Sequence, residues 1–174
     1  MRTPLPADLR EANERYAAAF GEKSSLDRRP ARRLAVLTCM DARVDPARAL
    51  GLEEGDAHVI RNAGGVATDD ALRSLVISNR LLGTTTGYVV GHTQCGMISF
   101  TNEELYDQLE GEGVDARWLD FLPFQEIEAS VAASVSRLRA TPLLPDDYRV
   151  EGFVFDVATG LLQPVGAAAA DAAS

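Results

Sequence analysis

Leu34-Ala35-Val36-Leu37-Thr38 is a short, almost continuous apolar run, and Cys39 follows it directly. Such a run is typical of a strand that is buried on both faces of a parallel sheet. Further strands are predicted at residues 58–60, 88–91 and 150–157. The segments between them have apolar residues at helical spacing, so strands alternate with helices. The sequence therefore predicts an α/β fold with a mostly parallel central β-sheet flanked by helices.

A helix is predicted over residues 8–23, ahead of the first strand. Its apolar residues recur at three- or four-residue steps and form one stripe. The stripe consists of Leu9, Ala12, Tyr16 and Phe20. The polar stretch 24–33 follows, so we expect a single domain over residues 1–165 in which 1–33 form an N-terminal helical arm. The arm must bury its stripe on its own domain or on a partner. The Ala-rich end, 166–174, is predicted to be a disordered tail.

Cap residues predict the ends of the flanking helices. Asp45-Pro46 is typical of an N-cap followed by proline at the first helical position, here of a very short helix. Thr68 is a second N-cap, and the helix that it begins should end at Gly83. Two more helices are predicted over residues 96–109 and 125–140.

The charge balance and the hydropathy pattern exclude several classes of partner. The 174 residues include 17 Lys and Arg against 26 Asp and Glu, for a formal net charge of −9. A pI of about 4.7 argues against nucleic acid as a partner, because nucleic-acid binders usually carry a basic face. No apolar run approaches the roughly 20 residues that cross a bilayer, so no membrane partner is predicted. The first residues have no apolar core of a signal peptide, and we therefore expect a cytoplasmic protein.

Three side chains that bind metals follow predicted strands. Cys39 comes directly after the first strand, His92 directly after the third, and Cys95 three residues later. Because ligands bind beyond the carboxyl ends of parallel strands, we expect these side chains to converge at one edge of the sheet. Two thiolates and one imidazole match a zinc site of the Cys2His type with one open position. The alternatives are two cysteines buried as small core residues, or a long-range disulfide between them.

Asp41 and Arg43 lie in the loop that carries Cys39. A carboxylate so close to a metal ion can coordinate it as a fourth ligand, or it can pair with Arg43 and accept a proton from metal-bound water. The planar fork of arginine suits a bidentate pairing with that carboxylate. Arg43 is the only nearby cation that the sequence offers. A surface salt bridge is the alternative, but the position beside Cys39 favours a catalytic pair.

Two short motifs together resemble a known family. Cys39-Met40-Asp41-Ala42-Arg43 and His92-Thr93-Gln94-Cys95-Gly96 look like the paired signature of the β-class carbonic anhydrases. Residues 55–65, which end in Gly64-Gly65, are similar to the family's segment after its second strand. The resemblance covers most of the chain, and the two motifs at this separation are a far more specific signal than either one.

The resemblance implies the architecture of an active site. It implies zinc bound by Cys39, His92 and Cys95. It also implies an Asp41–Arg43 dyad, in which Arg43 holds Asp41 off the metal so that water takes the fourth position. In some members of the family the aspartate occupies that position instead and closes the site. The resemblance further implies a dimer as the basic unit, alone or as a dimer of dimers.

The predicted function is the zinc-dependent, reversible hydration of carbon dioxide to bicarbonate and a proton through zinc-bound hydroxide. Gly64 and Gly65 are the candidate substrate-binding residues, because paired glycines allow a turn to approach another group closely. One alternative is a hydrolase of a related small linear molecule, such as carbon disulfide. Two others are a non-catalytic zinc-binding regulatory protein in which Asp41 closes the site, and a redox protein that uses a Cys39–Cys95 disulfide.

Some residues depart from the family's pattern or lie outside its motifs. Gln94 stands where aspartate is frequent, and Glu53 lies near the position of a glutamine that contributes to the substrate pocket of longer members. His58 begins a strand and is predicted to be a structural histidine. A group of aromatic residues is expected in the core or at an interface. They are Trp118, Phe121 and Phe124.

Overall fold

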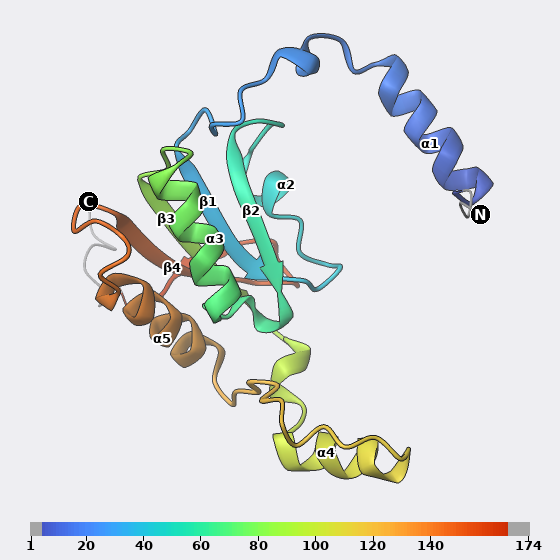
Figure 1. Ribbon diagram of the computed structural model, residues 1–174, viewed down its shortest axis with the longest axis vertical. Coiled ribbons are helices and arrows are strands. Elements are labelled where there is room, and N and C mark those ends of the chain that lie inside the picture. The colour runs from blue at the N-terminus through green and yellow to red at the C-terminus, as the bar shows by residue number, and fades with distance from the viewer. Residues whose placement is uncertain (1–4, 167–174) are drawn as a thin grey trace.

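A five-stranded sheet forms the centre of the computed structural model, which describes residues 5–166 (Figure 1). The strands are β1 (Leu34–Cys39), β2 (Ala57–Asn62), β3 (Thr86–His92), β4 (Arg149–Phe155) and β5 (Leu162–Pro164). They lie in the order β2-β1-β3-β4-β5, in which the first four run parallel and β5 is antiparallel to β4. The prediction of an α/β fold with a mostly parallel central sheet is confirmed.

Five helices and three 3-10 turns precede or connect the strands in the described part of the chain. The helices are α1 (Ala7–Ala18), α2 (Pro46–Leu50), α3 (Asp69–Arg80), α4 (Asn102–Gly111) and α5 (Ile127–Ala140). The 3-10 turns are η1 (Gly21–Ser25), η2 (Ala63–Gly65) and η3 (Gly96–Ile98). Both predicted N-caps are confirmed: the Asp45 side chain accepts a hydrogen bond from the Arg48 amide, and the Thr68 side chain accepts one from the Ala71 amide.

Two predicted helices are divided in the structure. The helix expected over 8–23 ends at Ala18, and η1 begins separately at Gly21, whose φ of +48° belongs to the left-handed region. The helix expected over 96–109 is also wrong at its start, because Thr101 begins α4 anew. Thr101 and Glu104 form a capping box, in which each side chain accepts from the other's backbone amide.

One face of the sheet carries the main core. Helices α3 and α5 lie side by side across this face (Figure 1). They bury alternate residues of β1, β3 and β4, among them Leu37, Val89 and Val154. Gly152 in β4 allows the close approach of α5, since a Cβ at this position would lie 2.7 Å from a methyl group of Val131.

The opposite face of the sheet is less well covered. Its buried residues are Leu34, Val36 and Val90, and α2 contributes Leu50 to their packing. Three aromatic side chains on this face are only partly buried. They are Tyr88, Phe153 and Phe155. Within one chain, this face therefore leaves apolar surface in contact with water.

Two segments project from the sheet at opposite ends, α1 and α4 (Figure 1). No residue of α1 is buried within the described chain, so the stripe that contains Leu9 and Tyr16 lacks the cover that it requires. The arm contacts its own chain at Glu54, which accepts hydrogen bonds from the Tyr16 hydroxyl and from Lys23 Nζ.

Trp118, in the loop after α4, is 81% exposed in the single chain, so of its two expected placements the core is excluded and an interface stays a prediction. Phe121 and Phe124 are partly buried. The predicted tail lies outside the described residues from 167 onward. Among the helices of residues 5–166, none has the length and apolar character needed to span a membrane.

Candidate metal centre

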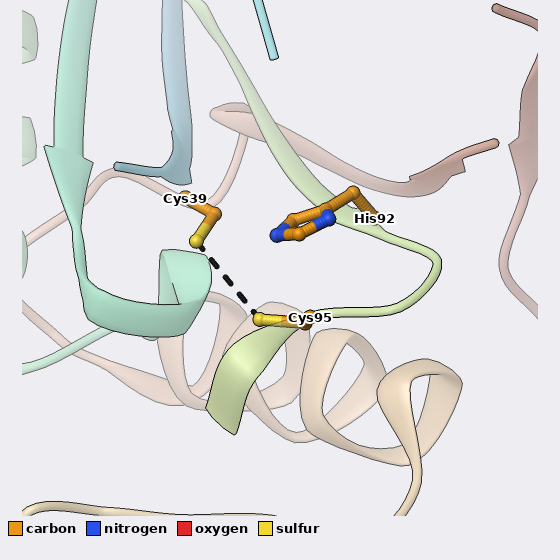
Figure 2. Close-up of side chains that lie close together, drawn as sticks. All are labelled: Cys39, His92 and Cys95. Carbon is orange, nitrogen blue, oxygen red and sulfur yellow. Dashed lines mark hydrogen bonds between the residues drawn. The ribbon is translucent and has the colours of Figure 1, made fainter. Parts of the chain in front are cut away.

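The three predicted ligands meet at one edge of the sheet. Cys39 is the last residue of β1 and His92 is the last residue of β3, and these strands are parallel neighbours. Cys95 lies in the turn between β3 and η3. The ligand atoms of the three side chains lie within 4.8 Å of one another, and each residue is at most 4% exposed. Figure 2 shows the two sulfur atoms and the imidazole directed toward a common point.

The His92 imidazole has one nitrogen without a protein partner. Nδ1 lies 2.9 Å from the carbonyl oxygen of Thr93. Since a carbonyl can only accept, Nδ1 carries the proton and Nε2 presents a lone pair. Nε2 is buried and has no hydrogen-bond partner among the described residues. Buried polar atoms are almost always paired, so this lone pair indicates a site for a ligand.

The two cysteines are free thiols in the described chain, with their sulfur atoms 3.9 Å apart. Burial, together with the nearby Cys39 sulfur, raises the pKa of the Cys95 thiol to about 11. A divalent cation stabilises thiolates in such surroundings, because a coordinating thiol is deprotonated outright. Two sulfurs and one imidazole nitrogen that faces them are a donor set suited to zinc. These residues therefore fit a bound metal ion, and the alternative of a disulfide is not what the structure shows.

Asp41 and Arg43 form the bidentate pair that their spacing suggests. Arg43 Nε donates to Asp41 Oδ1 at 3.0 Å, and Nη2 donates to Oδ2 at 2.8 Å. The Arg43 amide adds a third bond to Oδ1. These bonds hold the pKa of the Asp41 carboxyl well below its usual range. Asp41 Oδ2 lies 3.7 Å from His92 Nε2, so the carboxylate borders the metal centre.

A second arginine also reaches this loop, so the expectation that Arg43 is the only nearby cation is wrong. Arg61 Nε donates to the carbonyl oxygen of Cys39, and its Nη2 donates to the carbonyl oxygen of Asp41. Arg61 is in β2, beside Thr38 of β1 in the sheet register. The predicted strands could have revealed this contact, because a cation near the carboxyl end of a neighbouring parallel strand lies close to the ligand loop.

Gln94 is the other residue whose contacts were missed. Arg43 Nη2 donates to the Gln94 carbonyl at 3.0 Å, and Nη1 donates to Gln94 Oε1 at 3.4 Å. The Arg43 guanidinium thus connects the loop of Cys39 with the loop of His92 and Cys95. Sequence spacing alone does not reveal this contact, because the two residues are 51 positions apart.

Gly64 and Gly65 lie directly beneath the ligand loop. Gly65 has a φ of +66°, and a Cβ there would lie 3.0 Å from the backbone nitrogen of Cys39. At Gly64, with φ +81°, a Cβ would lie 2.8 Å from the ring of Phe124. Both glycines therefore permit close packing against the centre. Phe124, together with Phe100 and Met97, packs against the two cysteines and forms an apolar wall.

His58 lies away from this centre and has both ring nitrogens engaged. Its Nδ1 is 2.7 Å from the Ser78 hydroxyl and its Nε2 is 3.2 Å from the Arg28 carbonyl. These contacts agree with the structural role expected from the sequence.

Comparisons with known proteins assign this arrangement to a family. A family model described as carbonic anhydrase matches residues 34–123. The β-carbonic anhydrase 1 of Mycobacterium tuberculosis is 43% identical over 88% of this chain and 93% of its own length. The chain belongs to the β-carbonic anhydrase family. The match to the family model includes the three candidate ligands together with the Asp41–Arg43 pair.

Two further relatives bear on the fold and on the substrate of this β-carbonic anhydrase family member. The crystal structure of a carbonic anhydrase from Streptococcus mutans aligns with a TM-score of 0.88 and 44% identity, over 95% of this chain and 99% of that one. A carbon disulfide hydrolase from Acidianus is 36% identical over 76% of each chain. The family thus contains proteins named for two different substrates.

Proposed function

We propose that this chain catalyses the reversible hydration of carbon dioxide to bicarbonate and a proton, with zinc held by Cys39, His92 and Cys95. The observation that carries the proposal is the convergence of two buried sulfurs and an unpaired imidazole nitrogen beside an arginine-held carboxylate. Membership of the β-carbonic anhydrase family supports the same reaction.

Zinc held by these three residues would supply Lewis acidity, which lowers the pKa of water toward neutrality. The chain's own residues provide the orientation. Asp41 stays ionised because Arg43 donates to both of its carboxylate oxygens, so it can only accept hydrogen bonds. An anionic acceptor at the border of the centre orients the reacting water by its hydrogen atom. Arg43 keeps this acceptor in place and away from His92 Nε2.

We propose that the η2 turn and the apolar wall receive the substrate. Carbon dioxide is linear and has no net charge, so it suits a site that combines the buried Gly64-Gly65 turn with the side chains of Phe124 and Met97. Cys39, His92 and Cys95 would leave one position on zinc free, and Asp41 would occupy that position if the site closed.

Carbon disulfide hydrolysis is the second candidate. The observation that favours it is the same apolar wall next to the cysteines, together with relatives that are named carbon disulfide hydrolases. Release of hydrogen sulfide from carbon disulfide, measured beside carbon dioxide hydration on one preparation, distinguishes the two substrates. Carbon dioxide is the expected one, because the relatives of higher identity are carbonic anhydrases.

Stopped-flow measurement of carbon dioxide hydration, with the zinc content of the same sample, tests the proposal. We expect one zinc per chain and hydration well above the uncatalysed rate. Cys95→Ser should lose both zinc and activity. Met40→Ser is the matched control, because Met40 is 66% exposed beside Cys39 and offers the same new hydroxyl outside the centre. One zinc per chain without hydration would identify the non-catalytic protein, and a chain without zinc but with a Cys39–Cys95 disulfide would identify the redox protein.

We further propose that the chain acts as a homodimer, alone or paired into a dimer of dimers. Two exposed apolar surfaces support this assembly: the stripe of α1 and the partly covered sheet face with Tyr88 and Phe153. The α1 arm of one protomer covering its partner would bury both. A specific interface buries more than about 1,000 Å² in total. Light scattering at micromolar concentration should give two or four times the chain mass, and removal of residues 1–20 should give a monomer.

The proposed location is the cytoplasm. Two free, buried thiols that bind a metal suit a reducing compartment. Fractionation of cells that produce the full chain tests this proposal, and recovery of the protein outside the cytoplasmic fraction would contradict it.

A further inference from the structure

Gln94, between two of the candidate ligands, has an unusual backbone. Its φ is +54°, in the left-handed region that residues other than Gly, Asn and Asp seldom occupy. Residues held in such conformations gather at functional sites, where the surrounding structure requires them. At Gln94 the conformation accompanies a specific contact, since the carbonyl oxygen faces the Arg43 guanidinium at 3.0 Å.

The contact with the Gln94 carbonyl adds to the hydrogen bonds that hold the Arg43 side chain in place. Two of its nitrogens bind the oxygens of Asp41, and Nη2 also donates to Gln94. The Arg43 side chain is 49% exposed, and a long side chain in water samples many rotamers. The Gln94 carbonyl therefore selects the rotamer in which the fork faces Asp41. The uncharged side-chain oxygen of Gln94 accepts only a long bond from Arg43 Nη1, at 3.4 Å, so it competes with Asp41 for the guanidinium less than a carboxylate would.

We propose that Gln94 is a positioning residue of the active site: its left-handed backbone presents its carbonyl oxygen to Arg43, which in turn holds Asp41 away from the metal. The inference rests on the proposed zinc site and its hydration activity. Asp41 Oδ2 is 2.8 Å from Arg43 Nη2 and 3.7 Å from His92 Nε2. A small displacement of Arg43 is therefore enough to let the carboxylate approach the ligands and close the site.

Two substitutions separate the backbone of residue 94 from its side chain. Gln94→Gly keeps the carbonyl and adopts the left-handed conformation freely, whereas Gln94→Val resists it because valine is β-branched. In the zinc-loaded full chain, we expect Gln94→Gly to stay within about twofold of the wild-type kcat and Gln94→Val to lose about tenfold. Both should keep one zinc per chain. Crystal structures should show the Arg43–carbonyl bond in the glycine variant, and its loss, with Asp41 bound to zinc, in the valine variant.

A control excludes a general effect of backbone strain. Leu122 also has a positive φ, +56°, and lies outside the Asp41–Arg43 pair and the ligands. Leu122→Val should leave kcat and zinc content unchanged. If Gln94→Val does not fold, Gln94→Ala replaces it, with an expected loss of about threefold relative to Gln94→Gly.

Three results would overturn the inference. One is a valine variant that retains wild-type activity. A second is a valine variant in which Asp41 and Arg43 keep their present geometry. The third is a glycine variant as impaired as valine, because the carbonyl would then not be the acting group. A wild-type enzyme that holds zinc without hydrating carbon dioxide would refute the proposed function instead, and the crystal structures would still test the position of Arg43.

Discussion

The two histidines of this chain have different surroundings, although each belongs to a parallel strand. In β2, His58 has both nitrogens paired: Nε2 donates to the Arg28 carbonyl, and Nδ1 accepts from the Ser78 hydroxyl. At the end of β3, His92 has one nitrogen paired with Thr93 and the other buried without a partner in the described chain. A fully paired histidine stabilises the fold, whereas a buried imidazole with one free lone pair is prepared for a ligand.

Replacing each histidine by alanine tests this difference in role most directly. His92→Ala removes one of three ligands and should abolish zinc binding, with hydration falling by at least about three powers of ten. His58→Ala should keep one zinc per chain and near-wild-type hydration. Elemental analysis and stopped-flow rates on both variants check the prediction. Zinc retained by His92→Ala at one equivalent would exclude His92 as a ligand.

Arg43→Ala tests whether Arg43 keeps Asp41 from binding the metal beside His92. The variant should keep its zinc but lose about two powers of ten in hydration rate, which corresponds to about 2.7 kcal/mol of transition-state stabilisation. Arg61 cannot substitute, because it binds the carbonyl of Asp41 and not its carboxylate. A crystal structure at neutral pH should show Asp41 as the fourth ligand.

Arg48→Ala is the control for Arg43→Ala, since Arg48 pairs with Asp45 near the same loop but its side chain is 91% exposed. It should leave the rate and the zinc content unchanged. If Asp41 stays off the zinc in Arg43→Ala and the rate is near that of the wild type, the dyad does not operate.

Two glycines allow the stability cost of an added Cβ to be compared between the metal centre and a distant turn. Gly65 and Gly83 both have positive φ, +66° and +78°. At Gly83 a Cβ would meet nothing within 4 Å, so Gly83→Ala should cost only the backbone strain, about 1 kcal/mol. At Gly65 the new Cβ also collides with the backbone of Cys39, so Gly65→Ala should cost about 3 kcal/mol. Denaturant unfolding of both variants measures the difference, and equal losses would refute the close approach.

The smallest expected effect belongs to the paired histidine. His58→Ala removes the acceptor of the buried Ser78 hydroxyl, which retains its contact with Thr84. The free energy of unfolding should fall by about 1–2 kcal/mol. His58→Asn, which can still accept a hydrogen bond, should recover part of the loss. A change in zinc affinity in either variant would contradict the separation of the two histidines.

Much of the metal centre was predictable because its parts lie at strand ends. A buried apolar run before Cys39 and another before His92 place both residues at the carboxyl edge of a parallel sheet, whatever the order of the strands. The start of α4 was predicted too early because the apolar spacing continues through η3 as it would in a helix. The Thr101–Glu104 capping box, which marks the true start, lies inside the predicted range 96–109. The sequence left Trp118 between a core and an interface position, because an aromatic side chain is compatible with both.

The sequence by itself determined the alternation of strands and helices, the N-caps at Asp45 and Thr68, and the motif residues of the centre. These features depend on backbone preferences and on neighbours a few positions apart. Only the tertiary structure decided that Arg61 binds the ligand loop and that Gln94 holds Arg43. Such contacts join residues 22 and 51 positions apart, so they depend on strand register and on the turn at residue 94. The physical reason is that a hydrogen bond requires a placement within a few tenths of an ångström, which packing of the whole sheet sets and local spacing does not.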